Sequence, residues 1–239
     1  MRGGPFRDSS RPRFGWQAMT AAVLGGVVVV LLVLAALPWQ PITALDRDVA
    51  AGLHAAALDH PGVTRANRVL SDFVWDPWTF RLLTAAFVVW LLWRGERLLG
   101  WWLGGTVLVG SGVQQGLKAA LGRERPQWRE PVDSAHFSAM PSGHALTAAL
   151  VCVTLLWLWH ERGASTTDAR WRCAAAVACV SVAGVAFTRL WLGVHWLTDT
   201  LVGMVLGTAM ALASAAAWAA LRTGERLPVP ARGPEPEDH

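Results

Sequence analysis

A histidine and an aspartate stand four positions apart near the start of the last long apolar stretch of the chain. His195 and Asp199 would share one face of a helix, because residues at i and i+4 are neighbours there. A carboxylate bonded to one imidazole nitrogen fixes the tautomer of the ring and supports positive charge on it, which leaves the other nitrogen free to attack. Such pairs are common on helix surfaces, so this one is weak evidence by itself.

A second group, Pro141-Ser142-Gly143-His144, has the residue types of an anion site at the start of a helix. The first backbone N–H groups of a helix bind phosphate oxygens with help from the helix dipole. The Ser142 hydroxyl can donate a further hydrogen bond, and Gly143 permits close approach of the backbone. His144 would lie beside the bound anion, where it can protonate a leaving oxygen.

A third set of residues supplies positive charge. Lys118 is the only lysine among 21 basic residues, and Arg125 follows it by seven positions. Arg189 precedes the His195 and Asp199 pair. Arginine grips phosphate through two parallel hydrogen bonds, whereas lysine acts as a compact point charge. The neighbours to which we assign no role, and which we expect to be solvated loop residues, are Arg123, Arg129 and His136.

The composition is that of a membrane protein. Hydrophobic residues make up 53% of the chain and charged residues 16%, against about 25% charged in a typical soluble domain. The 15 tryptophans suit membrane interfaces. The basic residues lie in short runs between apolar stretches, so the net charge of +4 does not indicate a nucleic-acid partner. The sequence therefore favours a protein among membrane lipids.

Six stretches are apolar enough to cross a membrane as helices, and the second is short and contains Arg81. They cover residues 17–37, 77–93, 98–117, 143–159, 173–187 and 196–221. The first has a long apolar core, so we interpret it as a retained anchor, not a signal peptide. Apolar residues at helical spacing predict a surface helix within 39–76. The expected fold is all-α: a polytopic membrane protein with six transmembrane helices bundled around an outward-facing phosphate site.

The domain organisation follows from these spans. We expect a basic cytoplasmic tail at 1–16, a membrane domain at 17–222 with an extracytoplasmic segment at 39–76, and a disordered cytoplasmic tail at 223–239. An even number of spans puts both termini on one side, and arginine is more frequent in the segments that would then be cytoplasmic. The three motif groups fall in two hairpins that open on the outer side of the plasma membrane, where they can converge.

Together the three groups resemble the signature of the type 2 phosphatidic acid phosphatase superfamily. That signature reads Lys-x6-Arg-Pro, then Pro-Ser-Gly-His, then Ser-Arg-x5-His-x3-Asp, and its order and spacings match residues 118–199. Thr188 departs from it, because it stands where the family usually has serine. Threonine keeps the hydroxyl group and adds a methyl group to the pocket.

The resemblance implies a role for each matched residue. His195 would attack phosphorus and form a phosphohistidine, Asp199 would orient it, and His144 would protonate the leaving group and then activate water. The residues that would hold the phosphate are Lys118, Arg125, Ser142, Gly143 and Arg189. Neither a metal nor another cofactor would be needed. The expected substrate is a lipid phosphate monoester or pyrophosphate: phosphatidic acid, phosphatidylglycerol phosphate or a polyprenyl pyrophosphate.

Three other interpretations share some of these features. A lipid phosphotransferase would form the same phosphohistidine and pass it to a lipid or sugar acceptor. Vanadium-dependent haloperoxidases resemble this family but are soluble, which the six apolar stretches argue against. An anion transporter would also bind a phosphate, but no clear internal repeat relates the two halves of this chain.

Overall fold

A computed structural model of the chain describes residues 14–37 and 39–224, and this described part consists of helices and loops without a β-strand. The helices are α1 (Phe14–Ala36), α2 (Gln40–Asp59), α3 (Pro61–Val69), the single π-helical turn η1 (Leu70–Val74), α4 (Pro77–Trp93), α5 (Arg97–Leu121), α6 (Gly143–Glu161), α7 (Ala169–Trp191) and α8 (Leu197–Gly224). The all-α prediction is therefore confirmed. Most of the two predicted tails, 1–13 and 225–239, lies outside the described residues.

Each of the six predicted spans corresponds to one long helix, namely α1 and α4 to α8. Among the described residues, four helical stretches are long and apolar enough to cross a membrane: Gly15–Leu34, Gly143–Glu161, Ala169–Trp191 and Leu197–Arg222. Helix α4 has only 17 residues, and α5 is not among these four. The membrane class is thus supported, and the count of six spans stays a prediction.

Helices α1 and α7 turn apolar side chains outward. Val23, Val30 and Val33 of α1 and Val177 and Val180 of α7 are largely exposed. In water, apolar faces of this extent would mark a contact surface. On helices of spanning length, apolar faces of this kind suit contact with lipid tails. A helix can expose them there because its backbone hydrogen bonds are satisfied internally.

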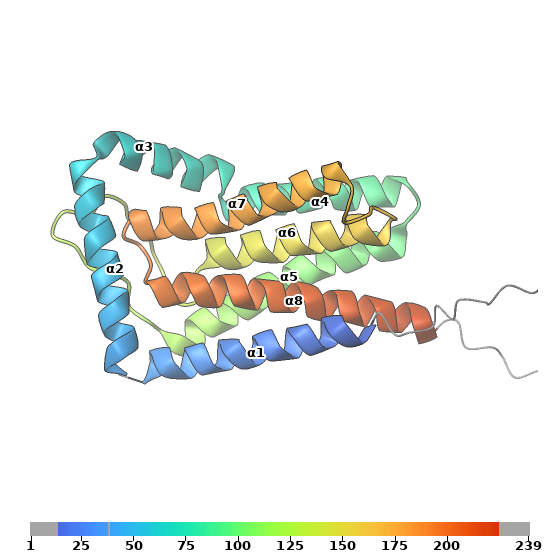
Figure 1. The fold of residues 1–239 in the computed structure, drawn as a ribbon, viewed down its shortest axis with the longest axis horizontal. Helices are drawn as coiled ribbons and strands as arrows, with labels where there is room; N and C mark the ends of the chain where they lie inside the picture. Colours follow the sequence, from blue (N-terminus) through green and yellow to red (C-terminus); the bar gives the residue numbers. More distant parts are fainter. Residues whose placement is uncertain (1–13, 38, 225–239) are drawn as a thin grey trace, which may run out of the picture.

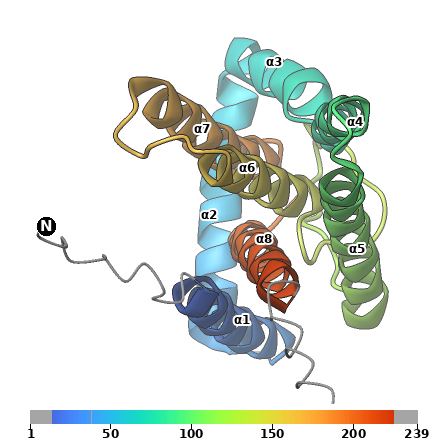
Figure 2. The same ribbon diagram turned by 90° about the vertical axis from the view of Figure 1, so that its right-hand side faces the viewer.

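Helices α6 and α8 form the centre of the bundle, with α1, α4, α5 and α7 around them (Figures 1 and 2). Two glycines of α8 let the central pair approach closely. A Cβ atom on Gly203 would lie 2.7 Å from the backbone oxygen of Ser142, and one on Gly207 would lie 2.4 Å from that of Leu146. This small-xxx-small spacing is typical of membrane helix pairs. It fixes the start of α8 against the start of α6, which both lie at the site.

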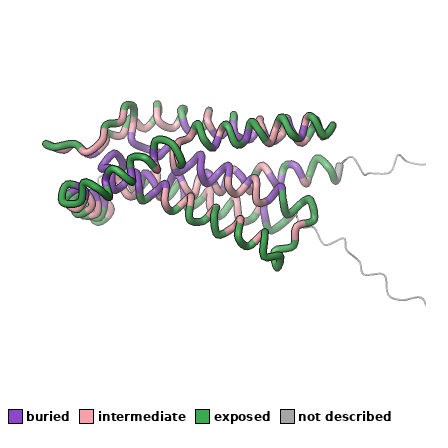
Figure 3. The backbone as a smooth tube through the Cα atoms, turned by 90° about the horizontal axis from the view of Figure 1, so that it is seen from above, coloured by how far each residue is buried: buried purple, intermediate pink, exposed green. Residues whose placement is uncertain are grey.

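The segment between α1 and α4 closes one end of the bundle. Helix α2 crosses that end almost at right angles to the long helices, and α3 leads from it back to α4 (Figure 1). The predicted helix within 39–76 is therefore present, divided at His60 by Pro61, which begins α3. Buried residues gather along the centre of the bundle and toward the end that α2 crosses (Figure 3). Polar side chains that face this end can therefore be withdrawn from solvent.

Candidate active site

Two loops meet under α2, one between α5 and α6 and the other between α7 and α8. Indole N–H groups join them: Trp128 Nε1 donates to the Gly193 carbonyl at 2.8 Å, and Trp196 Nε1 donates to the Glu124 carbonyl at 2.9 Å. Gly193 has φ +65, a left-handed conformation that favours glycine. The three motif groups therefore do converge at one end of the bundle, as their order along the chain predicts.

His195 lies in the short loop before α8, and Asp199 lies in the first turn of that helix. The expectation that both stand on one helix face is therefore wrong in detail, because α8 begins only at Leu197. The two side chains still meet: His195 Nδ1 is 3.4 Å from Asp199 Oδ2, and both side chains are almost completely buried. The Trp196 backbone N–H also donates to Asp199 Oδ2 at 2.8 Å.

The contacts of the imidazole favour one tautomer. Arg125 Nη1 lies 3.2 Å from His195 Nε2. A guanidinium group can only donate hydrogen bonds, so this contact favours a lone pair on the Nε2 atom. The ring proton is then on Nδ1, which faces the Asp199 carboxylate. This is the arrangement that a nucleophilic imidazole needs.

Burial also keeps His195 in its neutral form. Desolvation in this loop holds the pKa of the His195 imidazole well below its usual value near 6.5, and the positive charges of Arg125, Arg189 and Lys118 lower it further. Two of these cations, Lys118 and Arg125, contact loop carbonyls. Lys118 Nζ donates to the Ser138 carbonyl at 2.7 Å, and Arg125 Nε donates to that of Phe137 at 2.9 Å.

The third cation, Arg189, comes from the last turn of α7 and is buried. Its Nη1 atom donates to the Ser71 hydroxyl at 2.8 Å and lies 3.9 Å from Asp133 Oδ2. The Nε atom of Arg189 has no hydrogen-bond partner among the described residues. A buried donor without a partner is uncommon and needs a physical reason. An oxyanion in the adjacent pocket is a partner of matching chemistry.

The start of α6 presents the Pro-Ser-Gly-His group. Ser142 is the N-cap residue, and its buried hydroxyl has no hydrogen-bond partner in the described part of the chain. Gly143 leaves room for the Gln114 amide, because a Cβ atom there would lie 2.5 Å from the Gln114 side-chain nitrogen. His144 Nε2 is 3.6 Å from Asp76 Oδ2, so this second histidine has a carboxylate partner of its own.

Most of these groups line one pocket of about 270 Å³. The predicted site residues that line it are Lys118, Arg125, Gly143, His144, Arg189 and His195. Ser142 and Asp199 do not line the pocket. Thr188, the departure from the family signature, is buried in α7 and donates its hydroxyl to the Val185 carbonyl at 2.9 Å. Its hydroxyl proton is therefore used within its own helix, and Thr188 does not line the pocket.

Arg123 is not the solvated loop residue that the sequence suggested. Its Nη1 atom donates to Asp199 Oδ1 at 2.6 Å, and its Nη2 atom donates to Asp46 Oδ2 at 2.7 Å. The only sequence signal was its place beside Arg125 within the motif. Of the other two neighbours, Arg129 is exposed, and the exposed His136 lines the rim of the pocket.

Asp76 is the second residue that sequence reasoning missed. It caps α4 by accepting a hydrogen bond from the Trp78 backbone N–H at 2.7 Å, and its other oxygen faces His144. The Asp-Pro sequence before an apolar stretch signals a helix start, but nothing in it indicates a histidine partner. Within the described ranges, no group of three or more His, Cys, Asp or Glu residues is placed to hold a metal ion.

The environment of His195 predicts how its ring titrates. Because burial and three nearby cations lower the pKa, the ring should stay neutral as the pH falls from about 8 to about 6. Nitrogen NMR of histidine-labelled protein in detergent checks this, with the His195 signals assigned by their loss in His195→Ala. Protonation of His195 with a pKa at or above about 6.5 would contradict the assignment of a neutral nucleophile.

Comparison with known proteins places this geometry in a family. The PAP2 superfamily model matches residues 99–222, slightly more than half of the chain. The fold is similar to the crystal structure of the first transmembrane PAP2 type phosphatidylglycerolphosphate phosphatase from Bacillus subtilis. That match has a TM-score of 0.64 and 19% sequence identity, and it covers 82% of this chain and 94% of that one. No curated protein matches the chain. The family model, which covers more than half of the chain, agrees with the matched signature and with the shared fold. This chain therefore belongs to the PAP2 superfamily.

Proposed function

We propose that this protein hydrolyses a lipid phosphate monoester or pyrophosphate by way of a phosphohistidine on His195. The observation that carries the proposal is the orientation of the imidazole. Its Nδ1 atom faces the buried Asp199 carboxylate, and its Nε2 atom lies in contact with Arg125 beside the cationic pocket. A neutral nucleophile in a pocket with three cations is suited to attack on phosphorus.

In the first step, the lone pair of His195 Nε2 attacks phosphorus and the bond from phosphorus to the leaving oxygen breaks. His144 gives a proton to that oxygen, so an alcohol or a phosphate leaves. The imidazole gains positive charge, which Asp199 Oδ2 stabilises at Nδ1. The negative charge on the phosphoryl oxygens is held by Lys118 and the two arginines that line the pocket.

In the second step, water attacks the phosphohistidine and the nitrogen–phosphorus bond breaks. His144, now neutral, accepts the proton of that water, and His195 recovers its Nε2 lone pair. Inorganic phosphate then leaves, and His144 is ready to donate its proton in the next cycle. Asp76 Oδ2 lies 3.6 Å from His144 Nε2, so a negative charge stands beside the ring when it carries the proton.

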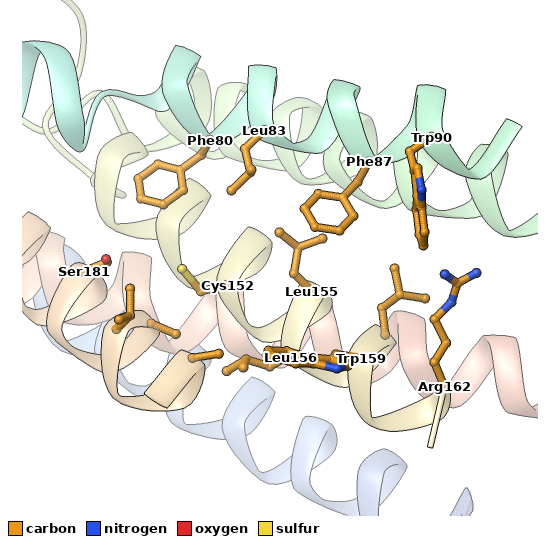
Figure 4. A pocket seen from close by; sticks show the side chains of 14 residues that line it. Phe80, Leu83, Phe87, Trp90, Cys152, Leu155, Leu156, Trp159, Arg162 and Ser181 are labelled. Atoms are coloured by element: carbon orange, nitrogen blue, oxygen red, sulfur yellow. The ribbon is translucent and has the colours of Figure 1, made fainter. Parts of the chain in front are cut away.

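A lipid substrate is favoured by an apolar cleft of about 620 Å³ between α4, α6 and α7. Phe80, Leu83 and Phe87 of α4 face Cys152 and Leu155 of α6 across it (Figure 4). The cleft and the phosphate pocket share α4: Phe80 lines the first, while its neighbours Trp78 and Arg81 line the second. A phosphate in the polar pocket can therefore have its hydrocarbon chain in the cleft.

The proposed arrangement in the cell follows the distribution of arginine. The membrane domain at 17–222 would lie in the plasma membrane, with both termini in the cytoplasm and the site on the outer side. The 39–76 segment would then cover the site from outside the cell. The similar protein from Bacillus subtilis is a phosphatidylglycerolphosphate phosphatase. This supports testing the same lipid here, together with phosphatidic acid and a polyprenyl pyrophosphate.

Phosphate release by the purified protein tests the proposed reaction. With each of these three lipids and EDTA in detergent, we expect wild type to release inorganic phosphate and His195→Ala to release none. His144→Ala should be slower by about 10²- to 10⁴-fold, the usual contribution of a general acid–base group. His160→Ala, at the exposed end of α6 and outside both pockets, is the matched control and should retain wild-type rates to within a few-fold.

The outcomes separate the alternatives. Equal rates in wild type and His195→Ala would contradict the proposed nucleophile. Loss of activity in EDTA that a divalent cation restores would contradict a metal-independent reaction. Transfer of phosphate to an added acceptor lipid without release of inorganic phosphate would identify a phosphotransferase. No turnover of any kind by folded wild-type protein would contradict the enzyme proposal.

The cleft predicts a dependence on chain length. Ala178 lines the cleft from α7, so Ala178→Trp should fill part of it. We expect kcat/KM for a long-chain phosphatidic acid to fall about tenfold or more, while that for butyl phosphate stays unchanged. Ala176→Trp, on an exposed part of α7 outside the cleft, is the control. Equal losses for both substrates, or none for the long chain, would exclude the cleft as a chain site.

A further inference from the structure

Asp46 is a buried carboxylate in α2, far before the region that matches the family model. Its side chain is 2% exposed and accepts three hydrogen bonds. Asp46 Oδ1 accepts from the Thr198 backbone N–H at 2.9 Å. Asp46 Oδ2 accepts from the Thr198 hydroxyl and from Arg123 Nη2, both at 2.7 Å. A carboxylate is costly to bury, so a site that satisfies it this fully has a specific geometry.

These contacts lead directly to the proposed nucleophile. Thr198 precedes Asp199, and its N–H lies in the first turn of α8, where helix N–H groups have no partner within the helix. Asp46 supplies that partner and so fixes the start of α8. Arg123 links the two acids: its Nη1 atom donates to Asp199 Oδ1 at 2.6 Å, while its Nη2 atom donates to Asp46.

The shared guanidinium assigns the two oxygens of Asp199 to different partners. Oδ1 is held by Arg123, and Oδ2 faces His195 Nδ1. The negative charge of Asp46 partly offsets the positive charge of Arg123. Without Asp46, that positive charge beside Asp199 would not be balanced. That carboxylate would then stabilise positive charge on the imidazole less well. Asp46 thus limits the pull of Arg123 and also holds Arg123 in place.

We infer that Asp46 is a positioning residue for catalysis, which sets the Asp199 carboxylate and, through it, the His195 nucleophile by way of Arg123 and Thr198. The inference rests on the proposed function, because it assigns how His195 is oriented for attack. It also gives α2 a role in the reaction: this helix lies outside the family match and holds the start of α8 from across the end of the bundle (Figure 1).

Steady-state kinetics in detergent, with whichever of the three candidate lipids wild type hydrolyses fastest, tests the inference. Asp46→Asn keeps an oxygen acceptor for the Thr198 N–H and removes the charge. We expect kcat to fall roughly 10- to 100-fold, the range for losing a partner that orients a functional side chain. KM should change less than threefold or so, because Asp46 does not line the pocket. Asp48→Asn, an exposed aspartate on the same helix, is the matched control and should behave as wild type.

A double-mutant cycle with Arg123→Gln separates a positioning role from general destabilisation. If Asp46 acts through Arg123, the double variant should lose little more kcat than the worse single variant. Multiplied losses would show independent effects and overturn the inference. So would an Asp46→Asn enzyme with wild-type kcat, or one whose loss of kcat is matched by a fall in the amount of folded protein by size-exclusion chromatography and thermal unfolding.

The failure of this inference differs from the failure of the proposed function. If wild type and Asp48→Asn release phosphate from none of the three candidate lipids, the proposed reaction itself is wrong. If both release phosphate and only the behaviour of Asp46→Asn departs from expectation, the reaction stands and the role of Asp46 is wrong. Asp46→Ala, which also removes the acceptor for Thr198, should lose at least as much kcat as Asp46→Asn.

Discussion

The Asp199 carboxylate is the group on which the rest of the site depends. Its side chain is fully buried, and it is shared between His195, Arg123 and the Trp196 backbone N–H. Burying a carboxylate costs several kcal/mol unless charges and hydrogen bonds compensate it. The loops around it are arranged to supply that compensation, and the same contacts fix which nitrogen of the histidine faces the pocket. Orientation of the proposed nucleophile is thus a consequence of satisfying one buried charge.

The membrane bundle explains how so many polar groups can gather at one end. Long apolar helices need no polar contacts along their length, so the charged side chains lie where helices begin and end. Lys118 and Arg189 come from the last turns of α5 and α7, while His144 and Asp199 come from the first turns of α6 and α8. Close packing at the two α8 glycines then fixes the starts of α6 and α8 against each other.

Sequence reasoning succeeded where the signal was local. The apolar stretches predicted the long helices, and α6 begins directly after Ser142, as the Pro-Ser-Gly-His group suggests. It failed where the signal was a partner distant along the chain. Arg123 was expected in solvent, because nothing in its own neighbourhood indicates that Asp46, 77 positions earlier, lies beside it.

The same limit applies to His144 and its carboxylate. Asp76 could be identified as a helix cap from the following proline, but its second contact depends on how α4 packs beside α6. The predicted position of His195 on the helix was a smaller error of the same kind. The spacing to Asp199 was correct for a contact, yet α8 begins only after the histidine. Spacing along the chain predicts proximity more reliably than it predicts the local backbone.

The central claim is that phosphorus becomes bonded to His195 during turnover. Rapid mixing with phosphatidic acid that carries radioactive phosphorus, followed by an alkaline denaturing quench, measures this directly, because a phosphohistidine survives base and is lost in acid. The account predicts label on wild-type protein and none on His195→Ala. Label that persists on His195→Ala, or wild-type protein that turns over without ever carrying label, would contradict it.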